Sequence, residues 1–383
     1  MRSEFKNIRW GDFAQFRYGR MPDKIKVSDD SSLYPIYSGY RIVGYYDEFN
    51  TEEGELVIVA RGVGGTGDVK LAPARCYLTN LSITATIDES IALKKYLYYY
   101  FALSNLRYLD SGSAQSQITI SDLQNVMLPL PSIVEQQSVV NTLSALDDKI
   151  ANNTKINNHL EQMAQAIFKS WFVDFEPFGG VMPDDWREGT LGEGVEMSTR
   201  ALNPQSCLDT ILEHYSIPAF DETRLPVFET ASEIKSNKYI VDKDCFLISK
   251  LNPTTKRIWR PYCISQYAVC STEFMVYRAK NRDHKDFYYS VIDNPAFTDF
   301  LLAHITGSTG SRQRAIPSET LSFSVVVPPD DIIEDFCDKV SAVYAHFEQN
   351  HLENRRLRQM RDTLLPRLIS GELSISDSEM NPK

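Results

Sequence analysis

One stretch of sequence occurs twice in this chain, and this repeat constrains the fold more than any other feature. The first copy is Ser132–Phe175 and the second is Asp330–Leu373. Because an internal repeat marks a repeated structural unit, both copies are predicted to form the same element. A shift of 197 positions aligns identical residues: Ser144 with Ser341, Ala145 with Ala342, Asn153 with Asn350, Asn157 with Asn354, Leu160 with Leu357, Gln162 with Gln359 and Met163 with Met360.

Both copies carry a heptad pattern. Two series of residues, each with a period of seven and offset by four, form an a/d seam, which predicts a long helix with one packed stripe. A helix of about 40 residues would span roughly 60 Å. In the first copy the series are Val139, Leu146, Asn153, Leu160 and Ile167, and Leu143, Ile150, Asn157, Ala164 and Trp171; in the second they are Phe336, Val343, Asn350, Leu357 and Leu364, and Val340, Phe347, Asn354, Arg361 and Leu368.

The middle of each seam is polar, with Asn153 and Asn157 in the first copy and Asn350 and Asn354 in the second. Only an antiparallel, in-register pairing brings one centre against the other, and a buried Asn costs stability while it rejects shifted registers. We therefore predict an intramolecular antiparallel coiled coil whose register these four residues set. Leucine at both Asn153 and Asn350 should then stabilise the helices and loosen their register. The alternative is two separate helices whose Asn side chains face water.

Length and composition bound the class of protein. At 383 residues, with 43% hydrophobic and 11% aromatic residues, the chain is predicted to form two or three domains. No apolar run approaches the roughly 18 residues of a transmembrane helix, and Met1–Lys6 has no apolar signal region, so we expect a cytoplasmic protein without membrane contact. The six cysteines form no C-x-x-C pair, which favours reduced thiols over disulfides or a metal site.

The net charge of −11 would argue against a nucleic-acid partner if it were spread evenly. Residues 1–131 carry 14 Lys and Arg against 15 Asp and Glu, and residues 186–327 carry 16 against 17. Residues 132–185 carry 3 against 8 and residues 328–383 carry 7 against 11, so −9 of the −11 lies on the helical repeats and their flanks. Each balanced globular segment can therefore present a basic face.

The segments that precede the two repeats are predicted to be strand-rich and to share one order of elements. In each, strands are followed by a helix, a Gly/Ser loop, a strand that ends in prolines, and then the long helix. The short helices are expected at residues 93–110 and 286–304, and Pro177–Pro183 has the composition of a linker. Predicted strands are Leu56–Ala60, Ser82–Ile87, Val126–Pro131, Cys245–Ser249, Phe274–Tyr277 and Phe323–Val327.

Gly62–Gly67 satisfies G-x-G-x-x-G after an apparent strand, which is the pattern of a dinucleotide or S-adenosylmethionine site. That fingerprint requires a helix next, whereas Asp68–Pro73 contains a proline and no helical stripe. We therefore predict a glycine-rich turn between strands and no cofactor in this chain. The six scattered histidines form no nucleophile–base or metal set with nearby residues, so no catalytic or metal-binding residue is predicted.

Basic and polar residues on candidate loops point to DNA instead. Arg and Gln read guanine and adenine edges through paired hydrogen bonds, and Lys and Arg neutralise phosphates. Any one of these residues, taken alone, is as well explained as an ordinary solvent-exposed side chain. The prediction therefore depends on several of them lying close together. The candidate DNA-binding residues are Arg61, Lys70, Arg75, Gln115 and Gln117 in the first half, and Lys250, Lys256, Arg257, Arg260, Arg312, Gln313 and Arg314 in the second.

Three motifs make the chain resemble a known family, the specificity (S) subunits of type I restriction-modification systems. Leu128–Pro131 followed by Glu135–Gln137 is similar to the family's Leu-Pro-Pro-x-x-Glu-Gln. Ile167–Phe175 closes the first long helix, and Leu364–Leu373 closes the second, as in that family. The second copy departs from the first motif, since Pro328–Asp335 contains no Gln.

The resemblance implies an α+β fold in which two strand-rich target recognition domains are joined by two long helices, an antiparallel intramolecular coiled coil with pseudo-two-fold symmetry. Each domain would read one half of a bipartite, asymmetric site on double-stranded DNA, while the helices set the spacing and dock two methyltransferase subunits. S-adenosylmethionine would belong to that partner, and ATP and Mg²⁺ to restriction subunits of the full complex. The expected domains are 1–131 and 186–329 for recognition, 132–176 and 330–373 for the helices, 177–185 as linker and 374–383 as a flexible tail.

Two other functions are compatible with the same pattern. A structural adaptor would bind protein through both domains and use the coiled coil as a spacer, and it would bind no duplex at any salt concentration. A self-contained DNA enzyme would methylate adenine as a single purified chain. The resemblance implies neither, because it makes this chain the non-catalytic subunit of a methyltransferase and restriction complex.

Overall fold

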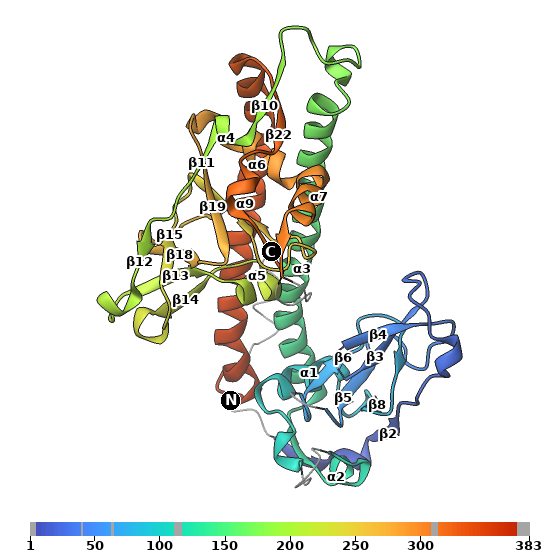
Figure 1. The fold of residues 1–383 in the computed structure, drawn as a ribbon. Coiled ribbons are helices and arrows are strands. Elements are labelled where there is room, and N and C mark those ends of the chain that lie inside the picture. The colour runs from blue at the N-terminus through green and yellow to red at the C-terminus, as the bar shows by residue number, and fades with distance from the viewer. Residues whose placement is uncertain (1–4, 40, 63–64, 111–116, 308–312, 374–383) are drawn as a thin grey trace, which may run out of the picture. The chain divides into compact units, whose positions relative to one another are not determined.

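A computed structural model of the chain (Figure 1) describes residues 5–39, 41–62, 65–110, 117–307 and 313–373. The chain divides into two compact units. Unit 1 is residues 1–150 together with 357–383, and unit 2 is residues 151–356. Each unit combines strands with part of both long helices, so the predicted α+β class, with two strand-rich domains joined by long helices, is confirmed.

The two repeats form α3 (Ile133–Phe172) and α9 (Asp330–Ile369), each of 40 residues. The shift of 197 positions carries both ends of α3 onto both ends of α9. A capping box opens α3, because the Glu135 carboxylate accepts from the Ser132 backbone N–H over 3.1 Å and the Ser132 hydroxyl accepts from the Glu135 N–H over 3.3 Å. Pro329 replaces that serine before α9, yet α9 begins at the aligned position.

Within unit 2, α3 and α9 run antiparallel and their seam asparagines meet in pairs. The Asn153 amide donates to Asn354 Oδ1 over 3.0 Å, and the Asn350 amide donates to Asn157 Oδ1 over 2.8 Å. All four side chains are buried. The antiparallel pairing is therefore confirmed, and the alternative in which these asparagines face water is wrong. Their role in rejecting other registers stays a prediction.

The observed pairs correct the substitutions proposed from the sequence. Asn153 and Asn350 belong to different pairs, so leucine at both positions leaves the buried amides of Asn354 and Asn157 without these partners. A buried polar group that loses its partner costs more than the hydrogen bond contributed. We therefore expect that double substitution to destabilise unit 2 rather than to stabilise it.

Replacing a true pair gives a cleaner test. Asn350→Leu alone is expected to lower the free energy of unfolding by about 1–3 kcal/mol, because Asn157 Oδ1 loses its donor in a buried site. Adding Asn157→Leu should restore at least about 1 kcal/mol, since both partners become apolar. Urea denaturation of the single and double variants measures this coupling, with Asn153→Leu/Asn350→Leu as the unpaired control. Strictly additive losses in both doubles would contradict the pairing.

In unit 1 the same two helices are joined by an acidic residue. Asp147 on α3 lies 2.9 Å from Arg361 Nη1 on α9, and it accepts a hydrogen bond from the Tyr99 hydroxyl over 2.7 Å. Tyr99 belongs to α1 (Lys94–Leu103). Asp147 therefore connects three helices at the edge of the unit 1 core.

The described strands of unit 1 form three antiparallel or mixed sheets around that core. The orders are β1-β9, β2-β8-β5-β6 and β4-β3-β7. The core contains Trp10, which is fully buried, and it is completed by Leu365 and Leu368 of α9. The bounds are β1 Lys6–Arg9, β2 Ala14–Tyr18, β3 Tyr34–Ser38, β4 Arg41–Tyr46, β5 Leu56–Val59, β6 Val69–Leu71, β7 Tyr77–Leu78, β8 Ser82–Ile87, β9 Met127–Leu130 and the short helix α2 Ile120–Gln124.

The glycine-rich segment after β5 leads into a strand. β5 and β6 pair antiparallel, so the predicted turn between strands is confirmed and the helix of a dinucleotide site is replaced by β6. Gly67 has a φ of 93°, and a Cβ at this position would lie 2.4 Å from the backbone nitrogen of Arg107. Glycine at this turn is therefore required both by the backbone conformation and by the close approach of a second segment.

The described strands of unit 2 surround a second core on the other portions of α3 and α9. The orders are β10-β22, β11-β19-β16-β17, β12-β15-β18-β13-β14 and β20-β21. The bounds are β10 Arg187–Thr190, β11 Val195–Met197, β12 Ala201–Leu202, β13 Ile211–Tyr215, β14 Val227–Thr230, β15 Lys238–Ile240, β16 Cys245–Ser249, β17 Ile258–Trp259, β18 Ala268–Ser271, β19 Phe274–Ala279, β20 Ile305–Thr306, β21 Arg314–Ala315, β22 Ser324–Val327, with helices α4 Leu191–Gly194, α5 Ile217–Thr223, α6 Lys285–Asp293, α7 Pro295–Ala303 and α8 Pro317–Thr320.

Both predicted short helices differ from those observed. The helix expected at 93–110 ends at Leu103, where the chain leaves α1. The helix expected at 286–304 is two helices, because Pro295 has no N–H to continue α6 and instead occupies the first turn of α7. The Asn294 side chain caps α7 by accepting from the Ala296 N–H over 2.9 Å.

The two units share one plan at the point where each meets a long helix. β1 pairs antiparallel with β9 directly before α3, and β10 pairs antiparallel with β22 directly before α9. The predicted strand that ends in prolines is therefore followed by the long helix in both halves, while most of each predicted Gly/Ser loop, at residues 111–116 and 308–312, lies outside the described residues. Among the residues that the structure describes, no helix is long and apolar enough to cross a membrane, and no group of three or more His, Cys, Asp or Glu side chains is placed to hold a metal ion.

Candidate nucleic-acid interface

The candidate residues of unit 1 lie on and beside the β5–β6 hairpin. Arg61 and Gln117 form an isolated antiparallel bridge, so the structure brings these two predicted residues together. Lys70 is exposed on β6. Arg75 is exposed, with its Nε 2.9 Å from Glu52 Oε2 and its guanidinium 5.0 Å from the ring centre of Phe49. Gln115 lies outside the described residues.

Four candidate residues of unit 2 form ion pairs with acidic residues far away in the sequence. Such pairs leave less positive charge for a phosphate than free cations would, although a DNA contact at these positions stays a prediction. Lys250 and Gln313 are half-buried, and Arg312 lies outside the described residues. The ion pairs are Lys256 with Asp293, Arg257 with Asp221, Arg260 with Asp286, and Arg314 with Glu273.

Two of these cations lie between the strands and the long helices of unit 2. Lys256 Nζ is 2.7 Å from Asp293 Oδ1, and Asp293 Oδ2 accepts from Gln165 of α3 over 2.6 Å. The Arg260 guanidinium lies 4.8 Å from the ring centre of Tyr344 of α9. These contacts hold the β17 region against α3, α6 and α9, so they have a structural role that the sequence analysis did not anticipate.

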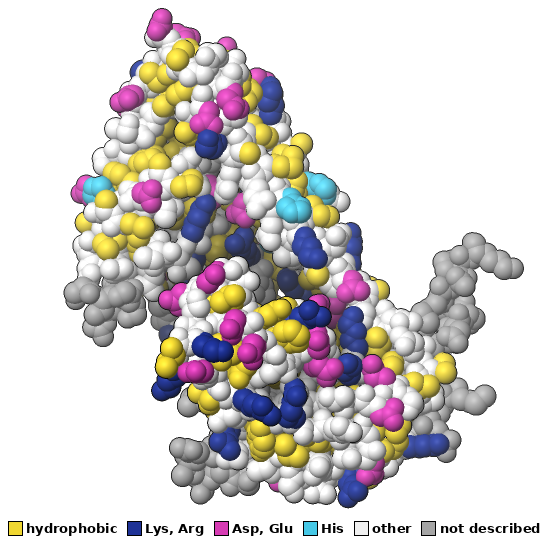
Figure 2. All heavy atoms as spheres, turned by 90° about the vertical axis from the view of Figure 1, so that its right-hand side faces the viewer, with side chains coloured by type: hydrophobic (Ala, Val, Ile, Leu, Met, Phe, Trp, Pro, Cys, Tyr) yellow, Lys and Arg dark blue, Asp and Glu magenta, His cyan; other side chains and the backbone are white. Residues whose placement is uncertain are grey.

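Unit 1 has further exposed basic residues that the sequence did not single out. They lie before and after β3, in a part of the sequence where acidic residues offset the basic ones, so net charge did not point to them. On the face shown in Figure 2, Lys and Arg side chains alternate with Asp and Glu over the described surface and do not gather into one basic tract. The exposed cations of this region are Arg20, Lys24, Lys26 and Arg41.

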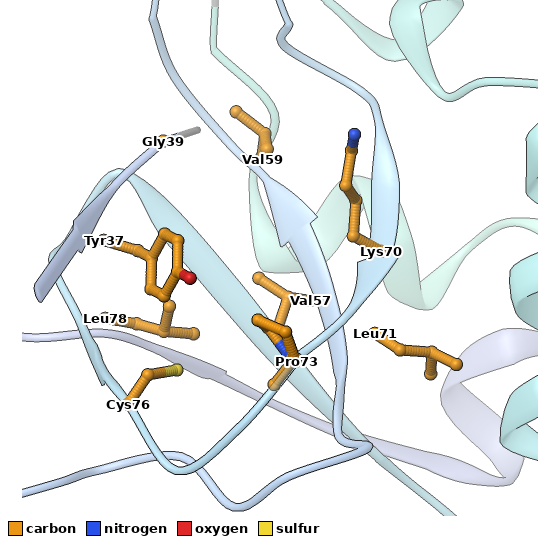
Figure 3. Close-up of a pocket in the computed structure, with 10 residues that line it drawn as sticks. Tyr37, Gly39, Val57, Val59, Lys70, Leu71, Pro73, Cys76 and Leu78 are labelled. Atoms are coloured by element: carbon orange, nitrogen blue, oxygen red, sulfur yellow. The ribbon is translucent and has the colours of Figure 1, made fainter. Parts of the chain in front are cut away.

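A pocket of about 310 Å³ also escaped the sequence analysis, because its walls come from two sheets (Figure 3). Tyr37 and Leu78, paired across β3 and β7, form one wall, and Val57 and Val59 of β5 form the other. Lys70 stands at the edge with its amino group directed away from the apolar floor (Figure 3).

Two groups within the pocket can donate hydrogen bonds at neutral pH. Burial raises the pKa of the Tyr37 hydroxyl, with smaller contributions from Cys76 and Tyr45. Burial also raises the pKa of the Cys76 thiol to about 11. Both groups therefore stay protonated, and the pocket combines apolar walls with an aromatic ring and few polar atoms.

Known proteins are similar to this chain in sequence. The family model described as "Type I restriction modification DNA specificity domain" matches residues 2–162. The specificity subunit of the type I restriction enzyme MjaIX from Methanocaldococcus jannaschii is 25% identical over 333 residues, which cover 78% of this chain and 73% of that protein. Residues 2–162 therefore match the type I specificity domain, and the chain as a whole is similar to type I specificity subunits. The HindI specificity subunit of Haemophilus influenzae is a second relative, 24% identical over 67% of this chain and 71% of its own length.

The fold of this chain is also that of a solved structure. The S subunit of a type I restriction-modification system from M. genitalium superposes with a TM-score of 0.63 and 18% identity, covering 96% of each chain. The two strand-rich units on paired long helices are thus a fold shared with a specificity subunit. The family model covers α1, the β5–β6 hairpin and most of α3, so the unit 1 candidates lie within the matched DNA specificity domain.

Proposed function

We propose that this chain acts as a specificity subunit and reads a bipartite, asymmetric site on double-stranded DNA, one half with the strand-rich part of each unit. The observation that carries the proposal is that two different sets of strands are attached to helices that repeat residue by residue. The frame is common to both units, while the described strands that it carries differ in their order. Different strands on a common frame favour two different half-sites.

The long helices are proposed to set the spacing of the half-sites and to dock two methyltransferase subunits. Major-groove faces on one side of DNA recur about every 34 Å, and 40-residue helices are long enough, at roughly 60 Å, to support readers about one turn apart. The bases between the half-sites would then go unread. Restriction subunits would join the full complex.

The chemistry is proposed to belong to the partners. S-adenosylmethionine would be bound by the methyltransferase subunits, and ATP and Mg²⁺ by the restriction subunits, while this chain would be non-catalytic. The pairing of β5 with β6 supports this division, because a strand follows the glycine-rich turn where a dinucleotide pyrophosphate would require a helix.

Deletion of the gene is expected to abolish adenine methylation at one two-part DNA motif. Sequencing that detects modified bases, applied to the source cell with and without the gene, measures this directly. The lost motif should be asymmetric and should contain an unread gap. Restoring the gene should restore the motif, whereas loss of a short continuous motif would contradict the assignment of one half-site to each unit.

A structural adaptor is the second candidate, and the ion pairs of the unit 2 cations favour it. If the methylation map does not change, purification of the chain from the source cell separates the two functions. Co-purification with a methyltransferase and salt-sensitive binding to duplex DNA support the specificity role, because phosphate contacts weaken as salt rises. Partners of another kind, with no duplex binding at low salt, support the adaptor.

A further inference from the structure

The pocket beside Tyr37 is larger than the edge of a stacked base pair would fill. Its volume of about 310 Å³ lies at the lower end of cavities that enclose a whole small ligand. A thymine methyl group reaching in from the major groove would fill only a small part of it. Six of the ten lining residues lie on β3, β5, β6 and β7, and the other four, Gly39, Ala72, Pro73 and Cys76, lie in the segments that follow β3 and β6.

The lining chemistry selects among the parts of a DNA molecule. Phosphate and sugar are strongly polar, whereas the pocket is built from Val57, Val59, Leu71 and Leu78 with the Tyr37 ring at one wall. Only the face of an unstacked base is both flat and apolar enough to lie against an aromatic ring in such surroundings. A base inside would also place its own phosphate near the edge, where Lys70 directs its amino group away from the floor (Figure 3).

The scarcity of polar groups narrows the choice of base. The Tyr37 hydroxyl points into the pocket (Figure 3), and the Cys76 thiol lines it. Purines and cytosine carry an exocyclic amino group or several unprotonated ring nitrogens, and these groups would lack partners against the apolar walls, at a cost. Thymine carries only two carbonyl oxygens and one N–H, the carbonyls can accept from the Cys76 thiol, and its methyl group suits the aliphatic wall.

We propose that this pocket binds a thymine that leaves the base stack of the bound DNA. The thymine would lie face to face with the Tyr37 ring, with its phosphate near Lys70. The inference rests on the proposed DNA-reading function and gives unit 1 a second mode of recognition besides contacts in the groove. It makes Tyr37 and Lys70 specificity-determining residues. Unstacking a base costs a few kcal/mol, which the pocket would recover only at the correct base.

The test combines two changes, a protein variant whose pocket is filled and a DNA duplex that lacks one base. The full chain, purified with its methyltransferase partner, is titrated with duplexes that carry the mapped site, and an abasic analogue replaces each thymine of the site in turn. Ala72→Phe places a ring in the pocket, and Ala102→Phe makes the same change on the exposed side of α1 as the matched control. Tyr37→Leu removes the stacking ring without filling the space, and melting temperatures confirm that each variant is folded.

Binding of the intact site by the unaltered complex tests the proposed function separately; without it, both the function and this inference fail. If binding occurs, Ala72→Phe and Tyr37→Leu should each weaken it about tenfold, and Ala102→Phe should not. At one thymine position, the one whose base enters the pocket, the variant and the unaltered complex should bind the abasic duplex with equal affinity. If the loss of affinity from the variant and the loss from the abasic analogue add at every thymine, the inference is overturned. Loss of the methyltransferase from the Ala72→Phe complex would also overturn it, because the pocket would then be a protein-docking site.

Discussion

Phe336→Ala is expected to lower the free energy of unfolding of unit 2 by about 3–5 kcal/mol. Phe336 is fully buried in α9 and its ring lies at the centre of an aromatic cluster that joins both long helices to α6. The cavity left by alanine would be lined by rigid rings that cannot easily close around it. The ring-centroid distances from Phe336 are 5.0 Å to Phe172, 6.0 Å to Phe168, 6.1 Å to Trp171 and 6.3 Å to Phe287.

Urea denaturation gives the change in stability, and hydrogen exchange measured by mass spectrometry assigns it to residues 151–356. Phe336→Leu is the matched control, because it keeps much of the buried volume and should cost clearly less. Equal losses for alanine and leucine would show that the cluster tolerates the missing ring. Faster exchange confined to unit 1 would contradict the assignment of Phe336 to the unit 2 core.

Leu368→Asp is expected to destabilise unit 1 by more than about 4 kcal/mol, because it places a carboxylate in an apolar core. Leu368 is 3% exposed and packs in the cluster that contains Val139, Val140 and Leu143 of α3. Protonation of the aspartic acid would reduce part of the cost, so the loss should be smaller at low pH.

Limited proteolysis followed by mass spectrometry measures this effect, with cleavage expected within residues 1–150 of the variant. Met360→Asp supplies the control, since Met360 lies on the same helix with 52% of its surface exposed. That change should alter stability by only a few tenths of a kcal/mol. A Leu368→Asp chain as resistant to protease as the Met360→Asp chain would contradict the packing of α9 against unit 1.

The long helices could be predicted from sequence because their heptad pattern is local and repeated. The same pattern predicted that the polar centres of the two seams would meet, and the antiparallel direction also determines which asparagine faces which. Asn153 meets Asn354 because antiparallel helices pair the start of one polar segment with the end of the other. The break at Pro295 was readable in principle, since proline cannot continue a helix, and the analysis missed it.

The candidate interface was harder to predict, because charge in the sequence does not show where the opposing charge lies. Arg257 meets Asp221 and Arg260 meets Asp286 only after the strands have been brought together. The pocket likewise requires Tyr37 and Val57 from different sheets to face each other. A long-range arrangement of this kind leaves no periodic signal in the sequence.

The core of unit 1 also has a consequence for synthesis of the chain. Leu365 and Leu368 pack in the same cluster as Trp10 and Leu143, so the amino-terminal half depends on residues made more than 200 positions later. Contacts of such large sequence separation form slowly, and exposed apolar surface on a growing chain attracts chaperones and promotes aggregation. Unit 2, whose residues are contiguous, can complete its fold earlier, so the half translated first is expected to be the last to finish.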